Sequence, residues 1–458
     1  MESLARELAR IVGPEHVLTG PASAPYEHDA TLARGLRGRA DAVVRPADPE
    51  QVAEVLRWSY AHGVPIVPRG GGTGLAGGAV PIDGGIVCAL ERLTRVRELE
   101  PGLWRMHVEA GLRTREVQRL ARENGLSFPP DPGAAESSQI GGNLATNAGG
   151  PHAFKHGPTG AWVTGLEAAI APGELISLGG PQRRDVAGYD LKSLLVGSEG
   201  TLGIITAVRL RLLPAPEARR ALLAFHRDLP TGCEALLAVL ASGLEPAALD
   251  FIDAAALEIL ATGKPEGSPR APAGAGFALL IDLEGSHPEV ARERAELEGV
   301  LAPDALELRD LEGPAAWRWR EGFGIAVAAL RGGKAGEDVV VPVEHLREAL
   351  EEIAKIAAAH GLPACAWGHA GDGNIHANLL IDPASPSERE AAARASEEIF
   401  ALATRLGGSV SGEHGVGLLK RGWLARQWPA AAIDLHEAIR RTLDPKGLLN
   451  PGKKLPRG

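Results

Sequence analysis

The sequence predicts an α+β protein of at least two domains, and its length, its composition and a change along the chain support this prediction. The 458 residues are enough for two or three domains of about 100–200 residues each. Hydrophobic residues make up 45% of the chain and charged residues 23%, which is typical of globular proteins. Glycine-rich clusters punctuate the chain up to about residue 217, whereas predicted strands alternate with helices beyond it.

The first clear element is βαβ-like. Short apolar strands are predicted at residues 41–45 and 64–68, with a helix between them. Asp48 can cap this helix, Pro49 suits its first position, and Gln51 lies where a capping box needs it.

A glycine-rich loop follows the second strand directly, from Arg69 to Gly78. It contains the letters of the dinucleotide fingerprint at Gly72, Gly74 and Gly77. That fingerprint requires a helix to begin at the loop, yet Pro81 and paired glycines follow, so we reject a Rossmann site. The loop can still hold a pyrophosphate through its own backbone N–H groups, and a tight surface turn is the alternative.

Two further clusters of small residues have the polar atoms to line a cofactor. Residues 129–150 are rich in Gly, Ser, Asn and Thr, and such a long loop in a compact domain is usually functional. Residues 197–203 form the third cluster and lead into a strand predicted at 204–213. Pro214 and Pro216 then mark a boundary.

The second part of the chain predicts an α+β sheet, ferredoxin-like, that serves as a cap. Strands are expected at residues 221–225 and 277–283, interleaved with helices near residues 231–242, 288–301 and 344–360.

Two histidines and a Glu-His pair carry candidate chemistry in the last third of the chain. His369 and His376 stand at either end of a Gly-Asp-Gly turn, and Asn378 shares a face with His376 if a strand follows. Both imidazoles are candidate metal ligands, and satisfied core histidines are the alternative. Glu413 could add an oxygen ligand and His414 could transfer a proton, although such pairs also occur in solvated turns.

Charge and cysteine content exclude several classes of protein. The net charge of -10 repels phosphate backbones, so we expect no nucleic-acid partner. The three cysteines are far apart, which fits a reducing cytoplasm better than a disulfide framework. No export signal and no apolar run long enough to span a membrane is visible, so we expect a cytoplasmic protein that reaches membranes only through partners.

Several motifs in the same order resemble the vanillyl-alcohol oxidase and p-cresol methylhydroxylase flavoprotein superfamily. The glycine clusters and residues 185–190 are similar to its flavin domain. Residues 369–376, 413–415 and 449–453 narrow the resemblance to the FAD-linked D-2-hydroxyacid dehydrogenases, which include the glycolate oxidase catalytic subunit, D-lactate dehydrogenase and D-2-hydroxyglutarate dehydrogenase. The resemblance covers nearly the whole chain from about residue 40.

The resemblance implies a two-subdomain FAD-binding domain of p-cresol methylhydroxylase type over residues 1–217, a substrate cap over 218–410 and a C-terminal return over 411–458. Covalent relatives often carry a linking His where this chain has Thr73, so we expect noncovalent FAD. The residues expected to hold FAD are Pro68, Arg69, Gly70, Gly71, Gly72, Thr73, Gly74, Leu75, Gly77, Gly78, Pro132, Ser137, Ile140, Gly141, Gly142, Asn143, Thr146, Asn147, Gly149, Gly150, Gly157, Glu199, Gly200, Gly203, Ile204, Ile205 and Asn450.

The resemblance also implies the reaction. His369, His376 and Glu413 would bind zinc or manganese, and Arg320 and Asn378 would contact the substrate. His414 would take the hydroxyl proton while the Cα hydrogen leaves as hydride to flavin N5.

The expected substrate is a small acid, glycolate or D-lactate. Gly324 stands where hydroxyglutarate-type relatives carry a hydroxyl residue, and Lys334 lies near their second carboxylate-binding lysine. No cysteine run for an iron–sulfur cluster occurs, so electrons would pass to a separate acceptor. The implied partners are an iron–sulfur subunit and a second flavin subunit of an oxidase complex, with a homodimer or hetero-oligomer as the assembly.

Two alternatives stay open. The first is a noncatalytic FAD-binding accessory subunit of a glycolate oxidase complex, which would keep the flavin loops and lose the metal-and-base set. The second is a metal-dependent hydrolase, which would leave the glycine clusters unexplained.

Overall fold

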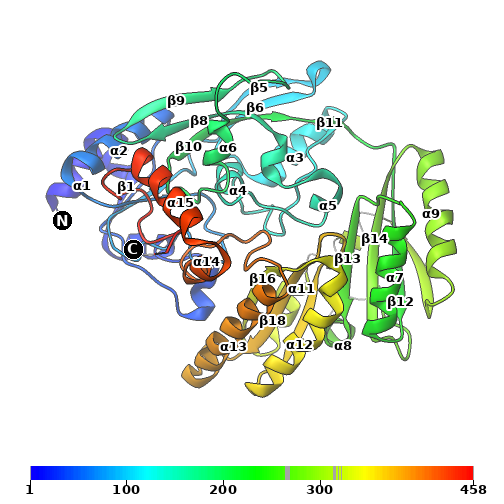
Figure 1. Cartoon of the computed structure of the whole chain (residues 1–458). Coiled ribbons are helices and arrows are strands. Elements are labelled where there is room, and N and C mark those ends of the chain that lie inside the picture. Colours follow the sequence, from blue (N-terminus) through cyan, green and yellow to red (C-terminus); the bar gives the residue numbers. More distant parts are fainter. Residues whose placement is uncertain (1, 264–268, 313–315, 318, 321, 457–458) are drawn as a thin grey trace. The chain divides into compact units, whose positions relative to one another are not determined.

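The computed structural model describes residues 2–263, 269–312, 316–317, 319–320 and 322–456, and Figure 1 shows its helices and strands. The chain forms two compact units. Unit 1 comprises Met1–Gly149, Pro158–Ala215 and Glu413–Gly458, and unit 2 comprises Gly150–Gly157 and Pro216–Gly412. No helix in the described part of the chain is both long and apolar enough to cross a membrane.

The first sheet of unit 1 has four strands in the order β1-β2-β4-β3. They are β1 (Val17–Leu18), β2 (Ala42–Val44), β3 (Ile66–Arg69) and β4 (Ile86–Ala89), and α2 (Pro49–His62) connects β2 to β3. Asp48 caps α2 by accepting the N–H of Gln51 at 2.8 Å, which confirms the predicted cap. The helix α1 (Glu2–Val12) precedes this sheet at the N-terminus. No helix begins within residues 70–85, all of which the structure describes, so the rejection of a Rossmann site is confirmed.

The second sheet of unit 1 is antiparallel, with five strands in the order β5-β6-β10-β8-β9. Its strands are β5 (Val96–Glu100), β6 (Arg105–Glu109), β8 (Val163–Ile170), β9 (Glu174–Gly179) and β10 (Ile204–Arg211). A short ribbon pairs β7 (Leu126–Ser127) with β11 (Leu213–Pro214). The helices of this unit are α3 (Thr114–Glu123), α4 (Ile140–Thr146), α6 (Leu191–Leu195), α14 (Arg421–Gln427) and α15 (Ala430–Leu443).

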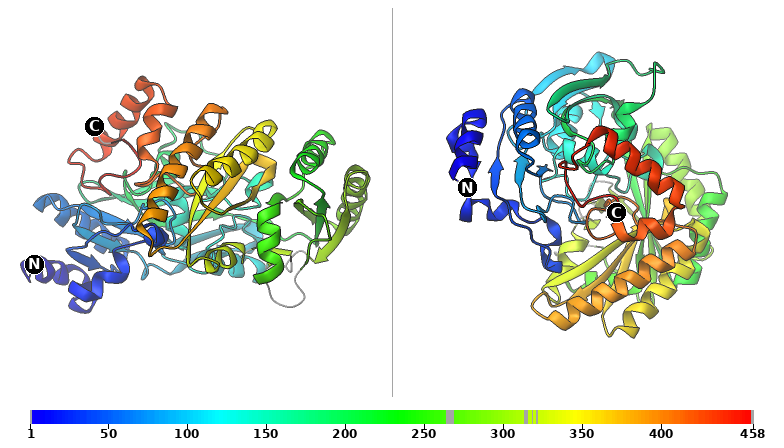
Figure 2. Two further views of the ribbon diagram at one scale, coloured as in Figure 1. Left: turned by 90° about the horizontal axis from the view of Figure 1, so that it is seen from below. Right: turned by 60° about the vertical axis from the view of Figure 1, so that its left-hand side comes forward.

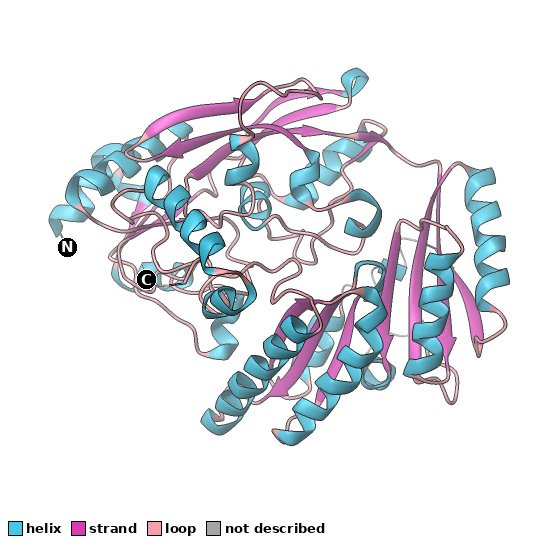
Figure 3. Ribbon diagram, in the orientation of Figure 1, coloured by secondary structure: helices cyan, strands magenta, loops and turns pink. Residues whose placement is uncertain are grey.

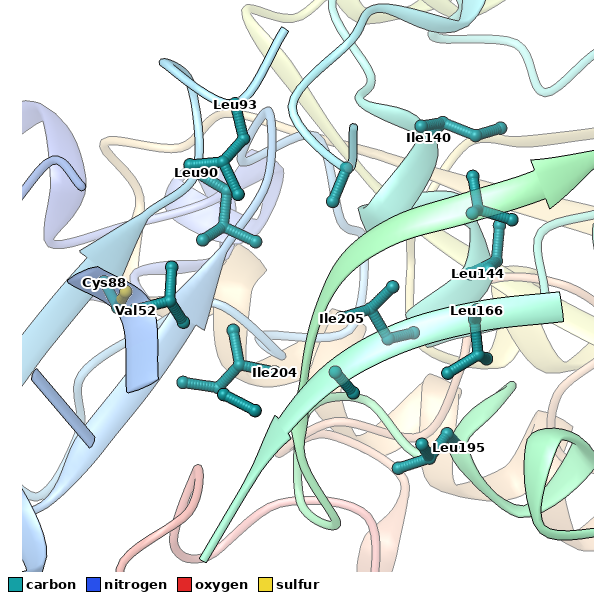
Figure 4. Packing of buried hydrophobic residues seen from close by; sticks show 14 of the residues in the cluster. Val52, Cys88, Leu90, Leu93, Ile140, Leu144, Leu166, Leu195, Ile204 and Ile205 are labelled. Carbon is teal, nitrogen blue, oxygen red and sulfur yellow. The ribbon is translucent and has the colours of Figure 1, made fainter. Parts of the chain in front are cut away.

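One hydrophobic core joins the two sheets of unit 1. Figure 4 shows Val52 and Cys88 of the first sheet layer in the same cluster as Leu166 and Ile205 of the second sheet and Leu144 of α4. Fully burying one such aliphatic side chain contributes about 1.5–3 kcal/mol. The first glycine-rich loop follows β3 directly and the third glycine-rich cluster precedes β10, so both adjoin strands that this shared core holds in place.

Unit 2 contains one seven-stranded sheet in the order β15-β12-β14-β13-β17-β18-β16. Its first half follows the βαββαβ pattern of ferredoxin-like domains, as predicted. This half runs through β12 (Ala218–His226), α7 (Leu229–Ala241), β13 (Ala248–Asp253), β14 (Phe277–Gly285), α9 (His287–Leu301) and β15 (Glu307–Glu312). Three more strands extend the sheet, namely β16 (Gly333–Val340), β17 (Ala364–His369) and β18 (Asn374–Ile381).

Helices cover both faces of this sheet. On one face α7 and α9 pack side by side, and so do α12 (Leu346–Ala359) and α13 (Pro386–Arg405), as Figures 2 and 3 show. On the other face α8 (Ala254–Gly263) packs against α11 (Phe323–Ala329). The core of that second face includes Phe225, Phe323 and Trp367. The short helix α5 (Ala153–His156) also belongs to unit 2.

Candidate functional site

In unit 1, the loop after β3 presents a row of backbone N–H groups. Its carbonyl groups bond to the rest of the unit, since Gly74 accepts the N–H of Ala30 at 3.1 Å and Ala76 accepts that of Leu418 at 2.8 Å. In contrast, no N–H of residues 71–79 donates a hydrogen bond to another residue of the described chain. Consecutive N–H groups of this kind form an anion-binding concavity, so the loop fits a pyrophosphate.

The predicted flavin-binding clusters come together around this loop. A Cβ added to Gly70 would lie 3.4 Å from the Cα of Gly142, in the second cluster, and one added to Gly200 would lie 3.0 Å from Cγ of Pro68. Asn450 donates through Nδ2 to the carbonyl of Gly78 at 2.9 Å. All of the predicted flavin-binding residues lie in unit 1 except Gly150 and Gly157, which lie in unit 2.

Buried polar atoms beside the clusters support a bound polar group. Oε1 of Gln139, Oγ of Ser198 and Oδ1 of Asn450 are buried without a hydrogen-bond partner among the described residues. Leaving such an atom unsatisfied costs about 1–3 kcal/mol, whereas the ribityl and phosphate groups of FAD can bond to it. Unit 1 therefore fits the cofactor.

The side chain of Glu199 bonds to the C-terminal segment of unit 1. Its carboxylate accepts the N–H groups of Val416 at 2.8 Å and Gly417 at 2.7 Å, and the ammonium group of Lys454 lies 3.3 Å away. The side chain thus holds the C-terminal segment of unit 1. His414 lies two residues before Val416 in that segment, and its Nε2 is 3.6 Å from Oε1 of Glu413.

In unit 2, five polar residues form a row across one face of the sheet. Directly paired residues and residues two apart share a face. The registers pair Asp282 with Ala248, Asp250 with His369, Trp367 with His376 and Asp338 with His376. In sheet order the row is Asp282, Asp250, His369, His376 and Asp338, on the strands β14, β13, β17, β18 and β16.

His369 and His376 meet on this face as predicted. Their ring centroids are 5.1 Å apart and nearly perpendicular, and one ligand nitrogen of each lies within 4.8 Å of the other. Both side chains are buried. Two imidazole nitrogens at this spacing can share a divalent metal of the zinc or manganese type.

Asp250 links the first of these histidines to Arg320. Its Oδ1 lies 2.7 Å from Nδ1 of His369, and its Oδ2 accepts Nε of Arg320 at 2.8 Å. Burial alone would raise the pKa of the Asp250 carboxyl, but His369 and Arg320 together hold this pKa below its ordinary value. Asp250 was not among the residues predicted from the sequence, although an aspartate inside an otherwise apolar strand is the signal that could have identified it.

Asn378 lies two residues after His376 on β18, and so on the same face of the sheet. It accepts the ammonium group of Lys334 at Oδ1 and donates through Nδ2 to the carbonyl of His376 at 2.8 Å. Burial lowers the pKa of Lys334 to about 8. A Cβ added to Gly324 would lie 3.7 Å from Nζ of Lys334, so Gly324 and Lys334 are neighbours in unit 2.

Asp338 anchors the end of unit 2 beside His376. Its carboxylate accepts Nδ2 of Asn374 at 2.6 Å, Oγ of Ser411 at 3.0 Å and the N–H of Gly412 at 2.9 Å. Glu413 and His414 are the next two residues of the chain and belong to unit 1. Sequence reasoning missed Asp338 as well, because its partners lie 36 and 73 or more residues away.

Comparisons with known proteins agree with both halves of this description. Residues 40–179 match the FAD binding domain family, and residues 215–454 match the family described as FAD linked oxidases, C-terminal domain. The glycolate oxidase subunit GlcD of Bacillus subtilis (strain 168) is 34% identical over 99% of this chain and 96% of that protein.

Two further relatives are similar over most of their length. A D-lactate dehydrogenase of Anaerostipes hadrus is 31% identical over 96% of this chain and 95% of that protein. A D-2-hydroxyglutarate dehydrogenase of Xanthomonas citri pv. viticola is 36% identical over 90% and 88%. The solved structure of p-cresol methylhydroxylase with substrate bound superposes with a TM-score of 0.83 at 16% identity, over 99% of this chain and 96% of that one. This likeness confirms the predicted fold.

Proposed function

Because the chain belongs to the FAD-linked oxidases, we propose that it oxidises a small D-2-hydroxy acid, glycolate or D-lactate, to the 2-oxo acid. The observation that carries the proposal is in unit 2, where His369 meets His376 and is joined to Arg320 through Asp250. When bound, FAD accepts the hydride at N5 and passes the electrons to a separate acceptor.

The N–H groups of residues 71–79 would hold the pyrophosphate of FAD, and the buried polar atoms of Gln139, Ser198 and Asn450 would bond to the rest of the cofactor. With Thr73 in the loop, we infer that FAD is bound noncovalently. Denaturing the purified protein in acid should therefore release the flavin into the supernatant.

A divalent metal, when bound, would lower the pKa of the substrate hydroxyl group by Lewis acidity. His369, His376 and Glu413 would be its protein ligands. Support comes from unit 2 and from the covalent chain: Gly412 is fixed to Asp338, which pairs with His376, and Glu413 is the next residue.

Arg320 would bind the substrate carboxylate. Its Nε is used by Asp250, which leaves both terminal N–H₂ groups for a two-point contact. Asn378 has a second amide hydrogen for the substrate besides the one it donates to His376. His414 would take the hydroxyl proton, because histidine is the side chain that most often serves as a general base.

Gly324 lacks the hydroxyl group that hydroxyglutarate-type relatives carry at this position, and this difference favours a small substrate. Lys334 lies near the site, and its ammonium group already donates to Asn378. A second substrate carboxylate would have to compete for it, so we favour glycolate and D-lactate over a dicarboxylate. Since the relative from Bacillus subtilis is a glycolate oxidase subunit, we also infer that this chain works beside an iron–sulfur subunit and a second flavin subunit, in the cytoplasm or at a membrane through those partners.

Anaerobic reduction of the flavin tests the substrate assignment. Glycolate, D-lactate, L-lactate and D-2-hydroxyglutarate are added separately to the purified protein while the oxidised-flavin band is recorded. Bleaching by glycolate or D-lactate supports the proposal, whereas bleaching only by D-2-hydroxyglutarate or L-lactate contradicts the substrate class. A yellow protein that dithionite reduces but none of these acids bleaches would favour the noncatalytic accessory subunit.

A further inference from the structure

We propose that Asp250 is a positioning residue that serves the metal ligand and the substrate-binding arginine at the same time. This inference rests on the proposed function, because His369 and Arg320 have their roles there. Asp250 is fully buried on β13, and each of its two carboxylate oxygens has one of these residues as a partner.

The contact with His369 decides which ring nitrogen can bind a metal. A carboxylate only accepts hydrogen bonds, so Nδ1 of His369 carries the hydrogen that points at Oδ1 of Asp250, 2.7 Å away. Nε2 then keeps its lone pair for a metal. Carboxylates that bind the second nitrogen of a ligating histidine fix its tautomer and ring orientation in this way.

The contact with Arg320 decides where the guanidinium group points. Nε donates to Oδ2 of Asp250 at 2.8 Å, and the guanidinium carbon lies 5.2 Å from the ring centre of Phe323 and 5.7 Å from that of Trp367. Bonded at Nε and packed on two aromatic rings, the group has its terminal nitrogens available in a fixed orientation. Such preorganisation reduces the entropy lost on binding a carboxylate.

A single carboxylate thus sets the geometry of both groups that would hold a chelating 2-hydroxy acid. Asp282 on the neighbouring strand β14 is equally buried on the same face and serves as a comparison. Oδ2 of Asp282 lies 2.8 Å from Nε2 of His152 and accepts Nε1 of Trp317 at 3.0 Å. Like Asp250 it bonds to a histidine, but its second partner is a tryptophan, and it touches neither His369 nor Arg320 by any bond that we observe among the described residues.

The substitution Asp250→Asn tests the inference, with Asp282→Asn as the matched control. An asparagine keeps the shape but turns one acceptor into a donor, so it cannot accept from both His369 and Arg320. We expect metal affinity to fall about 10–100-fold, the usual effect of losing such a partner. We also expect KM for the acid to rise about tenfold or more, the scale of one lost charge-assisted hydrogen bond.

The readouts are Mn²⁺ binding by electron paramagnetic resonance and Zn²⁺ binding by competition with a chromophoric chelator, on flavin-loaded protein, followed by steady-state KM. Circular dichroism and flavin content show whether each variant folds. The control should change metal affinity and KM by less than about threefold, well under the range expected for a ligand's partner. Asp250→Asn with metal affinity and KM both at the wild-type values would overturn the inference.

Failure of the proposed function would look different. A wild-type protein that binds neither ion, or that binds one with an affinity unchanged in His376→Ala, would remove the metal centre and overturn the His369 half of the inference. The KM of Asp250→Asn would still test whether Asp250 positions Arg320. If that KM also matched the wild-type value, Asp250 would be a structural residue only.

Discussion

The guanidinium group of Arg69 occupies the space in which a side chain on Gly72 would stand. A Cβ added to Gly72 would lie 2.0 Å from Nη2 of Arg69. Arg69 is held there by the carbonyl groups of His28, at 2.7 Å, and Pro25, at 3.2 Å. Gly72 also has a φ of +68°, which residues with a side chain rarely adopt. The loop can therefore take this course only with a glycine at position 72.

The substitution Gly72→Ala should weaken FAD binding. The left-handed backbone costs a residue with a side chain about 1–3 kcal/mol, and Arg69 must move as well. We expect FAD affinity to fall roughly tenfold or more, since about 1.4 kcal/mol corresponds to a factor of ten. Fluorescence titration of the apoprotein with FAD measures it. In the control Gly133→Ala, where nothing lies within 4 Å of the added Cβ, affinity should be unchanged.

The substitution Glu199→Gln should loosen the C-terminal segment. One carboxylate oxygen is replaced by an N–H₂ group that faces the N–H of Val416 or Gly417, which leaves a buried donor unsatisfied. We expect the free energy of unfolding to fall by about 1–3 kcal/mol, measured by denaturant titration. Glu98→Gln breaks a partly exposed ion pair with Arg209 and should cost under about 1 kcal/mol. Equal losses in the two variants would refute the role given to Glu199.

The substitution Arg320→Lys should raise KM while the protein stays folded. A lysine keeps the charge but cannot donate to Asp250 and to a carboxylate in the same planar geometry. The loss should be about 1–3 kcal/mol of binding, or roughly 10–100-fold in KM. Arg309→Lys is the matched control. Like Arg320, Arg309 lies over a phenylalanine ring, that of Phe225, and bonds to a carboxylate, that of Glu307. If both variants keep the wild-type KM, Arg320 does not bind the substrate.

The substitution Lys334→Met should change how stability depends on pH. Burial lowers the pKa of Lys334 from its ordinary 10.5 to about 8. Below pH 8 the group is protonated in both the folded and the unfolded protein. Between pH 8 and 10.5 only the unfolded chain keeps the proton, so unfolding becomes harder as the pH rises through this window.

The comparison therefore uses the free energy of unfolding of the two proteins from pH 7 to 10.5. The wild-type protein should gain stability relative to Lys334→Met over the upper part of this range. A constant difference between the two proteins across the whole range would show that the lysine titrates normally.

The flavin loops could be predicted because each one is a contiguous stretch of residues. The row on unit 2 could be predicted only in part. His369 and His376 are separated by one tight turn, so their proximity follows from local sequence. The contact between Asp250 and His369 spans 119 residues and exists only because β13 pairs with β17. Neither the composition nor the spacing of residues predicts which strands pair, and so Asp250 and Asp338 were not predicted as site residues.

Whether a metal at His369 and His376 assists the oxidation is best measured as flavin reduction in protein of defined metal content. The protein is depleted with a chelator, checked for retained FAD, and mixed anaerobically with glycolate or D-lactate in a stopped-flow spectrometer before and after adding back Zn²⁺ or Mn²⁺. If the metal assists the oxidation, the flavin of the depleted protein does not bleach and one of the two ions restores bleaching. Bleaching at an unchanged rate in fully depleted protein would contradict metal-assisted oxidation at His369 and His376.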